Sequence, residues 1–364
     1  MRTANLIACL AVLALTRATA TQPADHRVIL ISLDGARVEE MFAGLDVDVL
    51  RSTLGKNERL EESRVYQRFW AADSIARREK LLPFFWGTLM REHGSIAGNP
   101  ARGSRVQLAN RYRISYPGYS EMLVGRARDD LITSNDPVQN PSRTVLEFLR
   151  ERLSLTKEGV AAFTSWSVFN AIAESRAGSV TINAGFEAYD HPDPQVKALS
   201  DLQFRTPTPW ATVRHDVYTA SFAMAHLAAH KPRVLYLALG ETDDWAHDGR
   251  YDRVLEAFVR TDDILRELWT WLQSQPEYRG RTSVLITTDH GRGRGAAGWR
   301  HHGENYPDSR DAWMAFVSPH LAARGEWRDH PPVETRQVAA TLLQWMGIDW
   351  REFDPLVGPP VRRQ

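Results

Sequence analysis

The chain has 364 residues, of which 43% are apolar and 25% are charged, as in a globular protein with a full core. Lysine plus arginine equals aspartate plus glutamate at 45 each, so the formal net charge is zero. This balance argues against a protein that binds nucleic acids or anionic membranes, because such proteins typically have an excess of basic residues. We therefore expect a small-molecule substrate and no binding of a nucleic-acid duplex.

Residues 1–20 are predicted to be a cleavable signal peptide. Arg2 precedes an apolar stretch over 6–15, and Ala18-Thr19-Ala20 provides a cleavage site of small residues. The apolar stretch is too short to span a bilayer, so we expect no stable membrane insertion. Cys9, the only cysteine, would leave with the signal, and any metal would then be bound by His, Asp and Glu. The expected location is periplasmic or secreted.

Strands and helices are predicted to alternate along the rest of the chain. The helical patterns at 144–155, 217–230 and 251–274 have apolar residues three and four apart, and Ser142 is a candidate N-cap for the first. A closing amphipathic helix is predicted over 333–349. Apolar runs rich in β-branched residues predict buried strands at 27–35, 159–166, 233–243 and 282–291.

This alternation predicts a mostly parallel central sheet with helices on both faces. No repeat, low-complexity tract or linker interrupts it. We therefore expect a single α/β domain over 26–360.

Three of the predicted strands end in an acid: Asp34, Asp243 and Asp289. One such aspartate alone is more often a helix cap or a turn residue. In open α/β sheets, however, ligands bind at the carboxyl ends of the strands. We therefore expect the three carboxylates to converge on one edge of the sheet.

Histidines accompany two of these acids. Asp243 and His247 are four residues apart and would share one face of a helix, and His290 directly follows Asp289. Carboxylate oxygens and imidazole nitrogens are suitable ligands for zinc. Two ions about 4 Å apart are the usual arrangement for phosphoryl displacement. The six candidate ligands, three for each of two ions, are Asp34, Asp243, His247, Asp289, His290 and His302.

Five motifs, in the same order, resemble those of the alkaline phosphatase superfamily and, within it, the nucleotide pyrophosphatase/phosphodiesterase branch. They are "LISLDG", "ISYPGYSEMLVG", "ETDDWAH", "TTDHG" and "HHGEN", and together they cover nearly the whole chain after the signal. The resemblance implies an alkaline phosphatase-like fold, two Zn²⁺ per chain and hydrolysis of a phosphate ester through a phosphoserine.

The resemblance also implies which residues bind each ion. Of the two adjacent histidines, His302 fits the pattern better than His301, because a glycine follows it. One zinc would be held by Asp243, His247 and His302. The other would be held by Asp34, Asp289, His290 and the nucleophile.

The nucleophile implied by the resemblance is Ser115, which precedes an aromatic residue and a proline. Ser120 is the alternative, by a looser likeness to the cofactor-independent phosphoglycerate mutases. Asn135, at a spacing similar to the branch, would donate a hydrogen bond to a non-bridging phosphate oxygen, with Asn140 as its alternative. A phosphodiesterase is the leading hypothesis. The alternatives are a phosphomonoesterase, a mutase-like enzyme and a non-catalytic metal-binding protein.

Departures from the family patterns concern the substrate. "SYPGY" lacks the cysteine and arginine of the sulfatase motif, which argues against a sulfatase. Gly118-Tyr119 stands where the phosphodiesterase branch usually has Asn-His. A phosphomonoesterase would need extra positive charge near the phosphate, for which Arg111, Arg113 and Arg126 are candidates.

Overall fold

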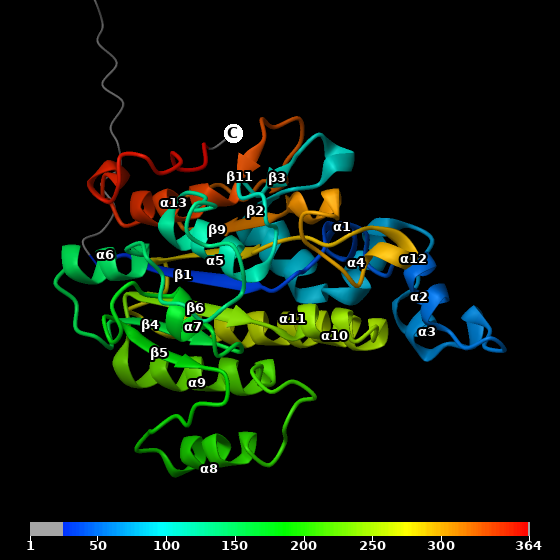
Figure 1. Ribbon diagram of the computed structural model, residues 1–364, viewed down its shortest axis with the longest axis horizontal. Helices are drawn as coiled ribbons and strands as arrows, with labels where there is room; N and C mark the ends of the chain where they lie inside the picture. The colour runs from blue at the N-terminus through cyan, green and yellow to red at the C-terminus, as the bar shows by residue number, and fades with distance from the viewer. Residues whose placement is uncertain (1–24, 363–364) are drawn as a thin grey trace, which may run out of the picture.

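An eight-stranded sheet runs through the middle of the computed structural model, which describes residues 25–362 (Figure 1). The strand order is β10-β2-β9-β7-β1-β6-β4-β5, and only β9 pairs antiparallel with its neighbours. The predicted mostly parallel sheet is therefore confirmed. The strands are β1 (Arg27–Leu33), β2 (Gly94–Ala97), β4 (Val160–Thr164), β5 (Thr181–Ala184), β6 (Val234–Leu239), β7 (Thr282–Thr288), β9 (Met314–Val317) and β10 (Gly325–Glu326). A small second sheet contains β11 (Val333–Glu334), β3 (Val106–Gln107) and β8 (Asp311–Ala312).

Helices cover both faces of the large sheet, because each central strand buries its side chains on both sides. In β1, Ile29 and Ile31 belong to one buried cluster, while Val28 and Leu30 belong to the other. The first cluster is completed by α1 (Val38–Ala43), α4 (Ser74–Leu81), the π-helix η2 (Phe85–His93), α9 (Asp216–His230) and α11 (Tyr251–Ser274). The second is completed by α5 (Ser115–Val124), α6 (Val145–Arg152), α7 (Phe169–Ile172) and α13 (Val338–Trp345). The predicted layers of helix, sheet and helix are present (Figure 1).

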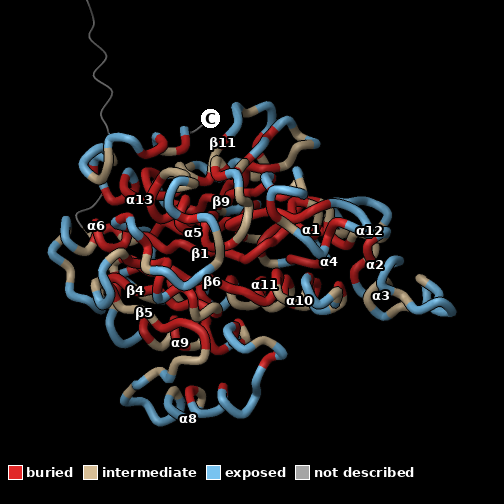
Figure 2. Tube along the Cα trace, in the orientation of Figure 1, coloured by how far each residue is buried: buried red, intermediate tan, exposed pale blue. Residues whose placement is uncertain are grey.

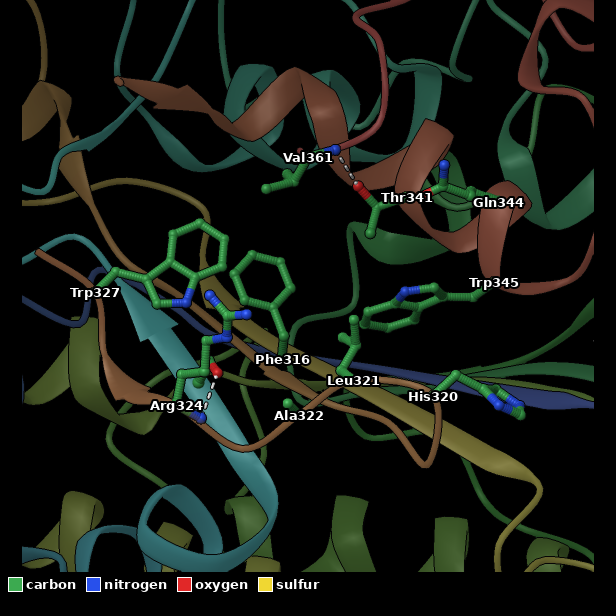
Figure 3. Close-up of a pocket in the computed structure, with 11 residues that line it drawn as sticks. Phe316, His320, Leu321, Ala322, Arg324, Trp327, Thr341, Gln344, Trp345 and Val361 are labelled. Carbon is green, nitrogen blue, oxygen red and sulfur yellow. Dashed lines mark hydrogen bonds between the residues drawn. The ribbon is translucent and has the colours of Figure 1, made fainter. Parts of the chain in front are cut away.

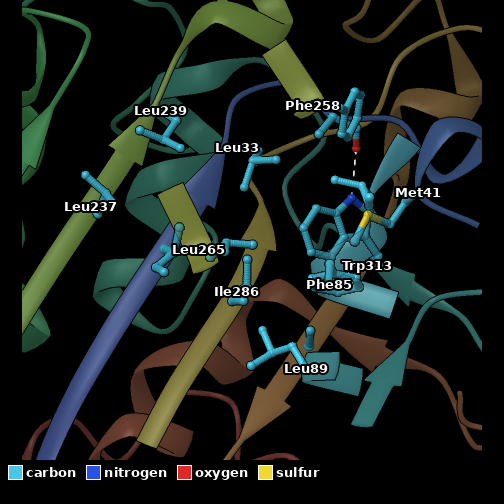
Figure 4. Packing of buried hydrophobic residues seen from close by; sticks show 14 of the residues in the cluster. Leu33, Met41, Phe85, Leu89, Leu237, Leu239, Phe258, Leu265, Ile286 and Trp313 are labelled. Atoms are coloured by element: carbon cyan, nitrogen blue, oxygen red, sulfur yellow. Dashed lines mark hydrogen bonds between the residues drawn. The ribbon is translucent and has the colours of Figure 1, made fainter. Parts of the chain in front are cut away.

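The packing of the first cluster holds the ends of the central strands in place. Figure 4 shows Leu33, Leu237 and Ile286, from three neighbouring strands, gathered beside Leu265 of α11. Burying one such side chain contributes about 1.5–3 kcal/mol. At the same end of the sheet, the indole N–H of Trp313 donates to the carbonyl oxygen of Ala36 at 3.0 Å. The residues that follow the strands therefore start from well-packed strand ends.

The remaining helices lie toward the outside of the molecule. Figure 2 shows that the segments around α8 are mostly exposed, whereas the central strands are buried. Within residues 25–362 no helix is both long and apolar enough to cross a membrane. The predicted signal peptide lies outside the described residues. The outer helices are α2 (Val47–Thr53), α3 (Arg64–Phe69), α8 (Pro194–Gln203), α10 (Glu241–His247) and α12 (Gly295–Gly298).

The structure differs from the sequence prediction at the end of β6. The strand predicted over 233–243 ends at Leu239, and α10 begins at Glu241. The buried carboxylate of Asp216 accepts the N–H groups of Gly240 (2.8 Å) and Glu241 (3.2 Å), which satisfies the start of the helix. Asp243 therefore lies in the first turn of a helix rather than at the end of the strand.

The N-cap predicted for the helix at 144–155 is also wrong. Thr144, not Ser142, caps α6, and Glu147 completes a capping box by accepting the N–H of Thr144. The hydroxyl of Ser142 instead interacts with the guanidinium of Arg128. The closing helix α13 begins later than predicted, at Val338, after a short 3₁₀ turn.

Candidate active site

Two neighbouring strands bring Asp34 and Asp289 together. β1 and β7 pair in parallel, with Leu33 opposite Thr288, so the residues that follow them leave the sheet side by side. Asp289 Oδ1 accepts the N–H of Gly35 at 3.0 Å, which ties the two strand ends to each other. His290 comes next in the chain and is completely buried.

Ser115, the first residue of α5, completes a group of four ligand atoms with these side chains. Its Oγ lies 3.5 Å from Asp34 Oδ1 and 3.3 Å from His290 Nε2. His290 Nε2 lies 3.4 Å from Asp34 Oδ1 and 3.5 Å from Asp289 Oδ2. Ligands about 2.0–2.1 Å from a tetrahedral zinc are about 3.3–3.4 Å from each other. These four separations are compatible with ligands of one zinc ion.

The hydrogen bonds of this group also indicate a cation. Asp289 Oδ2 is buried and has no hydrogen-bond partner among residues 25–362. His290 Nδ1 lies 2.9 Å from the carbonyl oxygen of Gly291, to which only an N–H can donate. In a neutral ring the lone pair of Nε2 would then face the two carboxylates. A cation between them satisfies all of these atoms.

Charge in this group is unbalanced. Burial, followed by the charge of Asp243, raises the pKa of Asp34. Burial and the charge of Asp34 likewise raise the pKa of Asp289 well above its ordinary value. Burial alone would lower the pKa of His290, but Asp289, Asp34 and Asp243 outweigh it and raise that pKa to about 9. A divalent ion would balance this excess of negative charge.

The second group combines one turn of α10 with the loop that follows β7. Asp243 Oδ2 lies 3.1 Å from His247 Nε2, because the two residues are one helical turn apart. His302 Nε2 lies 2.9 Å from His247 Nε2 and 3.8 Å from Asp243 Oδ1. His302 Nδ1 is 3.2 Å from the carbonyl oxygen of Arg113, which directs Nε2 toward the group. These three residues can also hold one ion.

The structure thus gathers all six candidate ligands into two groups of three, Asp34 with Asp289 and His290, and Asp243 with His247 and His302. It separates His301 from both groups. That side chain is exposed and stacks on the ring of Tyr306, with a distance of 5.5 Å between the ring centroids.

Asn135 lies beside the start of α5. Its Oδ1 accepts the main-chain N–H of Tyr116 at 2.9 Å, and its side chain is half-buried. This bond uses the amide oxygen and leaves the amide N–H₂ group next to the residue that follows Ser115.

The two alternatives for nucleophile and donor lie together, and neither side chain has a hydrogen bond to any of the six candidate ligands. Ser120 and Asn140 are buried, with Ser120 Oγ 3.4 Å from Asn140 Nδ2. Asn140 also donates to the carbonyl oxygen of Ile172 and accepts from the N–H of Ser142, each at 3.0 Å. These contacts give both side chains a structural role, which is to pack α5 against α7.

Two residues to which the sequence analysis assigned no role lie in the site. Tyr119 is buried, and its hydrogen bond to Asp34 opposes the rise in the pKa of that carboxyl. Arg292 is buried and donates to the carboxylate of Asp243. In the sequence, only its place three residues after Asp289 could have indicated a role for Arg292. Arg294 lies almost as near to Asp289, so the sequence does not distinguish the two arginines.

A separate cavity of about 210 Å³ lies between β9 and α13. Figure 3 shows Phe316, Trp327 and Trp345 around it, with Arg324 nearby. Both hydroxyl groups that line it already accept hydrogen bonds, Thr341 from the N–H of Val361 at 3.0 Å and Ser95 from the N–H of Arg324 at 3.1 Å. None of the six candidate ligands lines this cavity, so it is not part of the candidate active site.

Comparison with solved structures identifies the fold. A variant of the alkaline phosphatase PafA aligns over 93% of this chain and 98% of its own, with 11% identity and a TM-score of 0.59. An alkaline phosphatase superfamily protein from Vibrio parahaemolyticus aligns over 94% and 72%, with 12% identity and a TM-score of 0.51. A 2-O GAG sulfatase aligns over 89% and 71%, with 12% identity and a TM-score of 0.50.

At the level of sequence, no family model and no curated protein matches the chain. The chain therefore has the fold of the alkaline phosphatase superfamily, as its motifs predicted, and its structural neighbours include hydrolases of phosphate and sulfate esters. The likeness to the phosphodiesterase branch stays a prediction.

Proposed function

We propose that the chain is a metal-dependent hydrolase of phosphate esters in which Ser115 is the nucleophile. The observation that carries this proposal is the place of Ser115 Oγ, 3.5 Å from Asp34 Oδ1 and 3.3 Å from His290 Nε2 in a buried group with excess negative charge. A serine that served only to cap a helix would not need that position.

Two Zn²⁺ ions fit the two groups of side chains. Asp243, His247 and His302 would hold one ion, and Asp34, Asp289, His290 and Ser115 Oγ would hold the other. When bound, the ions would supply Lewis-acid catalysis, which stabilises the deprotonated serine and the charge on the phosphoryl oxygens.

The chain's own residues would act as follows. Ser115 loses its hydroxyl proton to water, its Oγ forms a bond to phosphorus, the ester P–O bond breaks, and the leaving alcohol takes a proton from water. Water then cleaves the phosphoserine and releases the phosphate product. The N-terminus of the ten-residue helix α5 points its partial positive charge at the phosphate. Asn135 donates from its amide N–H₂ to a non-bridging oxygen.

A phosphodiester is the favoured substrate, because the donor at Asn135 is uncharged. Two of the three candidate arginines also have acidic partners. Arg126 lies 3.2 Å from Asp354, and Arg111 lies 3.8 Å from Glu304. These partners reduce the positive charge that Arg126 and Arg111 offer to balance the second charge of a phosphomonoester.

A phosphomonoesterase is the second candidate, and Arg113 favours it. This residue stands two positions before Ser115, and its buried Nε has no hydrogen-bond partner among residues 25–362. Its main chain is held in the left-handed region, at φ 53°, where its carbonyl oxygen contacts His302. A guanidinium at this position could balance the extra charge of a monoester.

The test compares kcat/KM of the zinc-loaded protein for bis(p-nitrophenyl) phosphate, p-nitrophenyl phosphate and p-nitrophenyl sulfate. We expect the diester to be the best substrate. Preference for the monoester, abolished by Arg113→Gln, would establish the second candidate. Turnover of none of the three would support a non-catalytic metal-binding protein, and preference for the sulfate would contradict the proposed nucleophile.

We also propose that the protein is periplasmic or secreted, on the basis of its N-terminal sequence. Mass spectrometry of exported material should show a chain that begins near Thr21. Retention of Cys9, or a lipid-sized increment in mass on it, would contradict this location.

A further inference from the structure

Arg292 places a buried guanidinium against one of the candidate ligands. Only 2% of its surface is exposed. Its Nη1 donates to Asp243 Oδ1, while Nε and Nη2 donate to the carbonyl oxygens of Trp299 (2.9 Å) and Arg300 (2.8 Å). All three nitrogens of the guanidinium are therefore used, and they bind three different residues.

These bonds join the two segments that make up the second group of ligands. Asp243 and His247 lie on α10, whereas His302 lies on the loop that follows β7. Arg292 connects α10 to the part of that loop directly before His302. Arg300 adds a weaker tie, because its Nη2 donates to the carbonyl oxygen of His247 at 3.2 Å on the surface.

Arg292 also leaves one oxygen of Asp243 for His247. Its guanidinium occupies Oδ1, and Oδ2 is the oxygen that lies 3.1 Å from His247 Nε2. Gly35 packs against the same oxygen, because a Cβ there would stand 2.4 Å from Oδ1 and 3.0 Å from Arg292 Nη1. Oδ1 is thus packed against both the end of β1 and the guanidinium.

We propose that Arg292 is a positioning residue for the ion of the second group. By fixing Asp243 and the loop that carries His302, it sets the three ligands at the spacing that one ion requires. This inference rests on the proposed two-metal function. A positive charge beside a bound dication is in itself unfavourable, so the alternative is that Arg292 only weakens binding by repulsion. Partners that orient metal ligands typically change metal affinity 10–100-fold.

The experiment measures Zn²⁺ binding to the full-length, metal-free protein by calorimetric titration, without substrate. Arg292→Lys keeps the charge but cannot form the three bonds, and Arg292→Gln removes the charge. We expect both to lower the affinity for one of the two ions by about 10–100-fold and to leave the other unchanged. Arg294→Gln is the matched control, because Arg294 is exposed in the same loop and contacts Glu39, Asp308 and Asp311.

A second variant, Arg300→Gln, removes the weaker hydrogen bond at the surface, which joins Arg300 to the carbonyl oxygen of His247. We expect it to lower the affinity for the same ion by a smaller factor, with an unchanged melting temperature of the metal-free protein. This variant keeps the test decisive if the Arg292 variants fold poorly.

Three outcomes would contradict the inference or its basis. Unchanged or tighter binding in Arg292→Gln would show that the guanidinium only repels the ion. Loss of both ions together, with a lower melting temperature, would show that Arg292 maintains the fold rather than one group. A wild-type protein that binds fewer than two ions would instead contradict the proposed two-metal function, whatever the variants do.

Discussion

The Cα of Gly118 lies directly against the main-chain carbonyl of Asp289, so that a Cβ at residue 118 would stand 2.4 Å from that oxygen. No real Cβ contact is that short. The first turn of α5 therefore packs on the end of β7 with no side chain between them. This close approach is what brings Ser115 Oγ within 3.3 Å of His290 Nε2. It also gives a physical reason for the glycine where the phosphodiesterase branch usually has asparagine.

Gly118→Ala should impair activity through this contact. The added methyl group would force α5 away from β7 and move Ser115 out of its group. A misplacement of about 1 Å can cost about 100-fold in rate, and we expect a loss in kcat of at least this size. Gly87→Ala is the control, because no heavy atom lies within 4 Å of a Cβ at that position. Equal activity of the two variants would show that the close packing is not needed for turnover.

The nucleophile can be tested with a pair of alanine variants assayed on one diester. Ser115→Ala should remove hydrolysis, by about 10⁴-fold or more in kcat, since the Oγ of Ser115 is the hydroxyl that lies between Asp34 Oδ1 and His290 Nε2. Its zinc content and folding should stay nearly unchanged, because six ligands remain. Ser115→Thr should retain some activity.

Ser120→Ala serves as the comparison in that experiment. Ser120 is buried beside Asn140, so its loss should cost tenfold or less in kcat, equivalent to about 1.4 kcal/mol. An inactive Ser120→Ala together with an active Ser115→Ala would favour the mutase-like alternative.

The two ions should bind with unequal affinity. The group of Asp34, Asp289 and His290 has two carboxylates, whereas in the other group the single carboxylate of Asp243 is already paired with Arg292. The first group should therefore fill first as zinc is added to the metal-free protein. Asp289→Asn should abolish the tighter site and leave the weaker one, because a neutral amide is a poor zinc ligand. Elemental analysis of each variant after dialysis would check this, and loss of the weaker site alone would contradict the assignment.

The sheet and the ligands could be predicted from the sequence because their signals are local. Apolar runs predict strands, and acids or histidines at their ends predict a site at one edge, which is where Asp34, Asp289 and His290 lie. The choice of His302 over His301 came instead from the family resemblance, in which a glycine follows the histidine, as it does only after His302.

Features that depend on distant partners could not be predicted. Whether Arg292 or Arg294 is buried depends on the path of the loop up to Trp299, whose carbonyl oxygen accepts from Arg292. The start of α10 depends on Asp216, which is far from it in sequence but accepts its first N–H groups. In the sequence Gly118 is indistinguishable from an ordinary turn residue. Its close contact with the end of β7 is seen only in the structure.

Stability should depend on pH through His26, which is far from the site at the start of β1. The ring is fully buried, and its Nε2 lies 2.9 Å from Ser283 Oγ, while Nδ1 has no partner among residues 25–362. Burial, and next the charge of His320, lower the pKa of His26 from 6.5 to about 4. Between these two values the unfolded chain binds a proton that the folded chain does not.

The free energy of unfolding should therefore fall as the pH is lowered from 6.5 toward 4, by about 1.4 kcal/mol per pH unit from this residue. Urea unfolding of the metal-free protein at pH 7 and pH 5 would measure the change, with His26→Phe as the comparison, since phenylalanine fills a similar volume and does not titrate. Wild type should lose about 2 kcal/mol more than the variant between the two pH values. His290, with its pKa raised to about 9, acts in the opposite sense but is present in both proteins, so it cancels. Equal losses in the two proteins would show that His26 takes up a proton in the folded state as readily as in the unfolded chain.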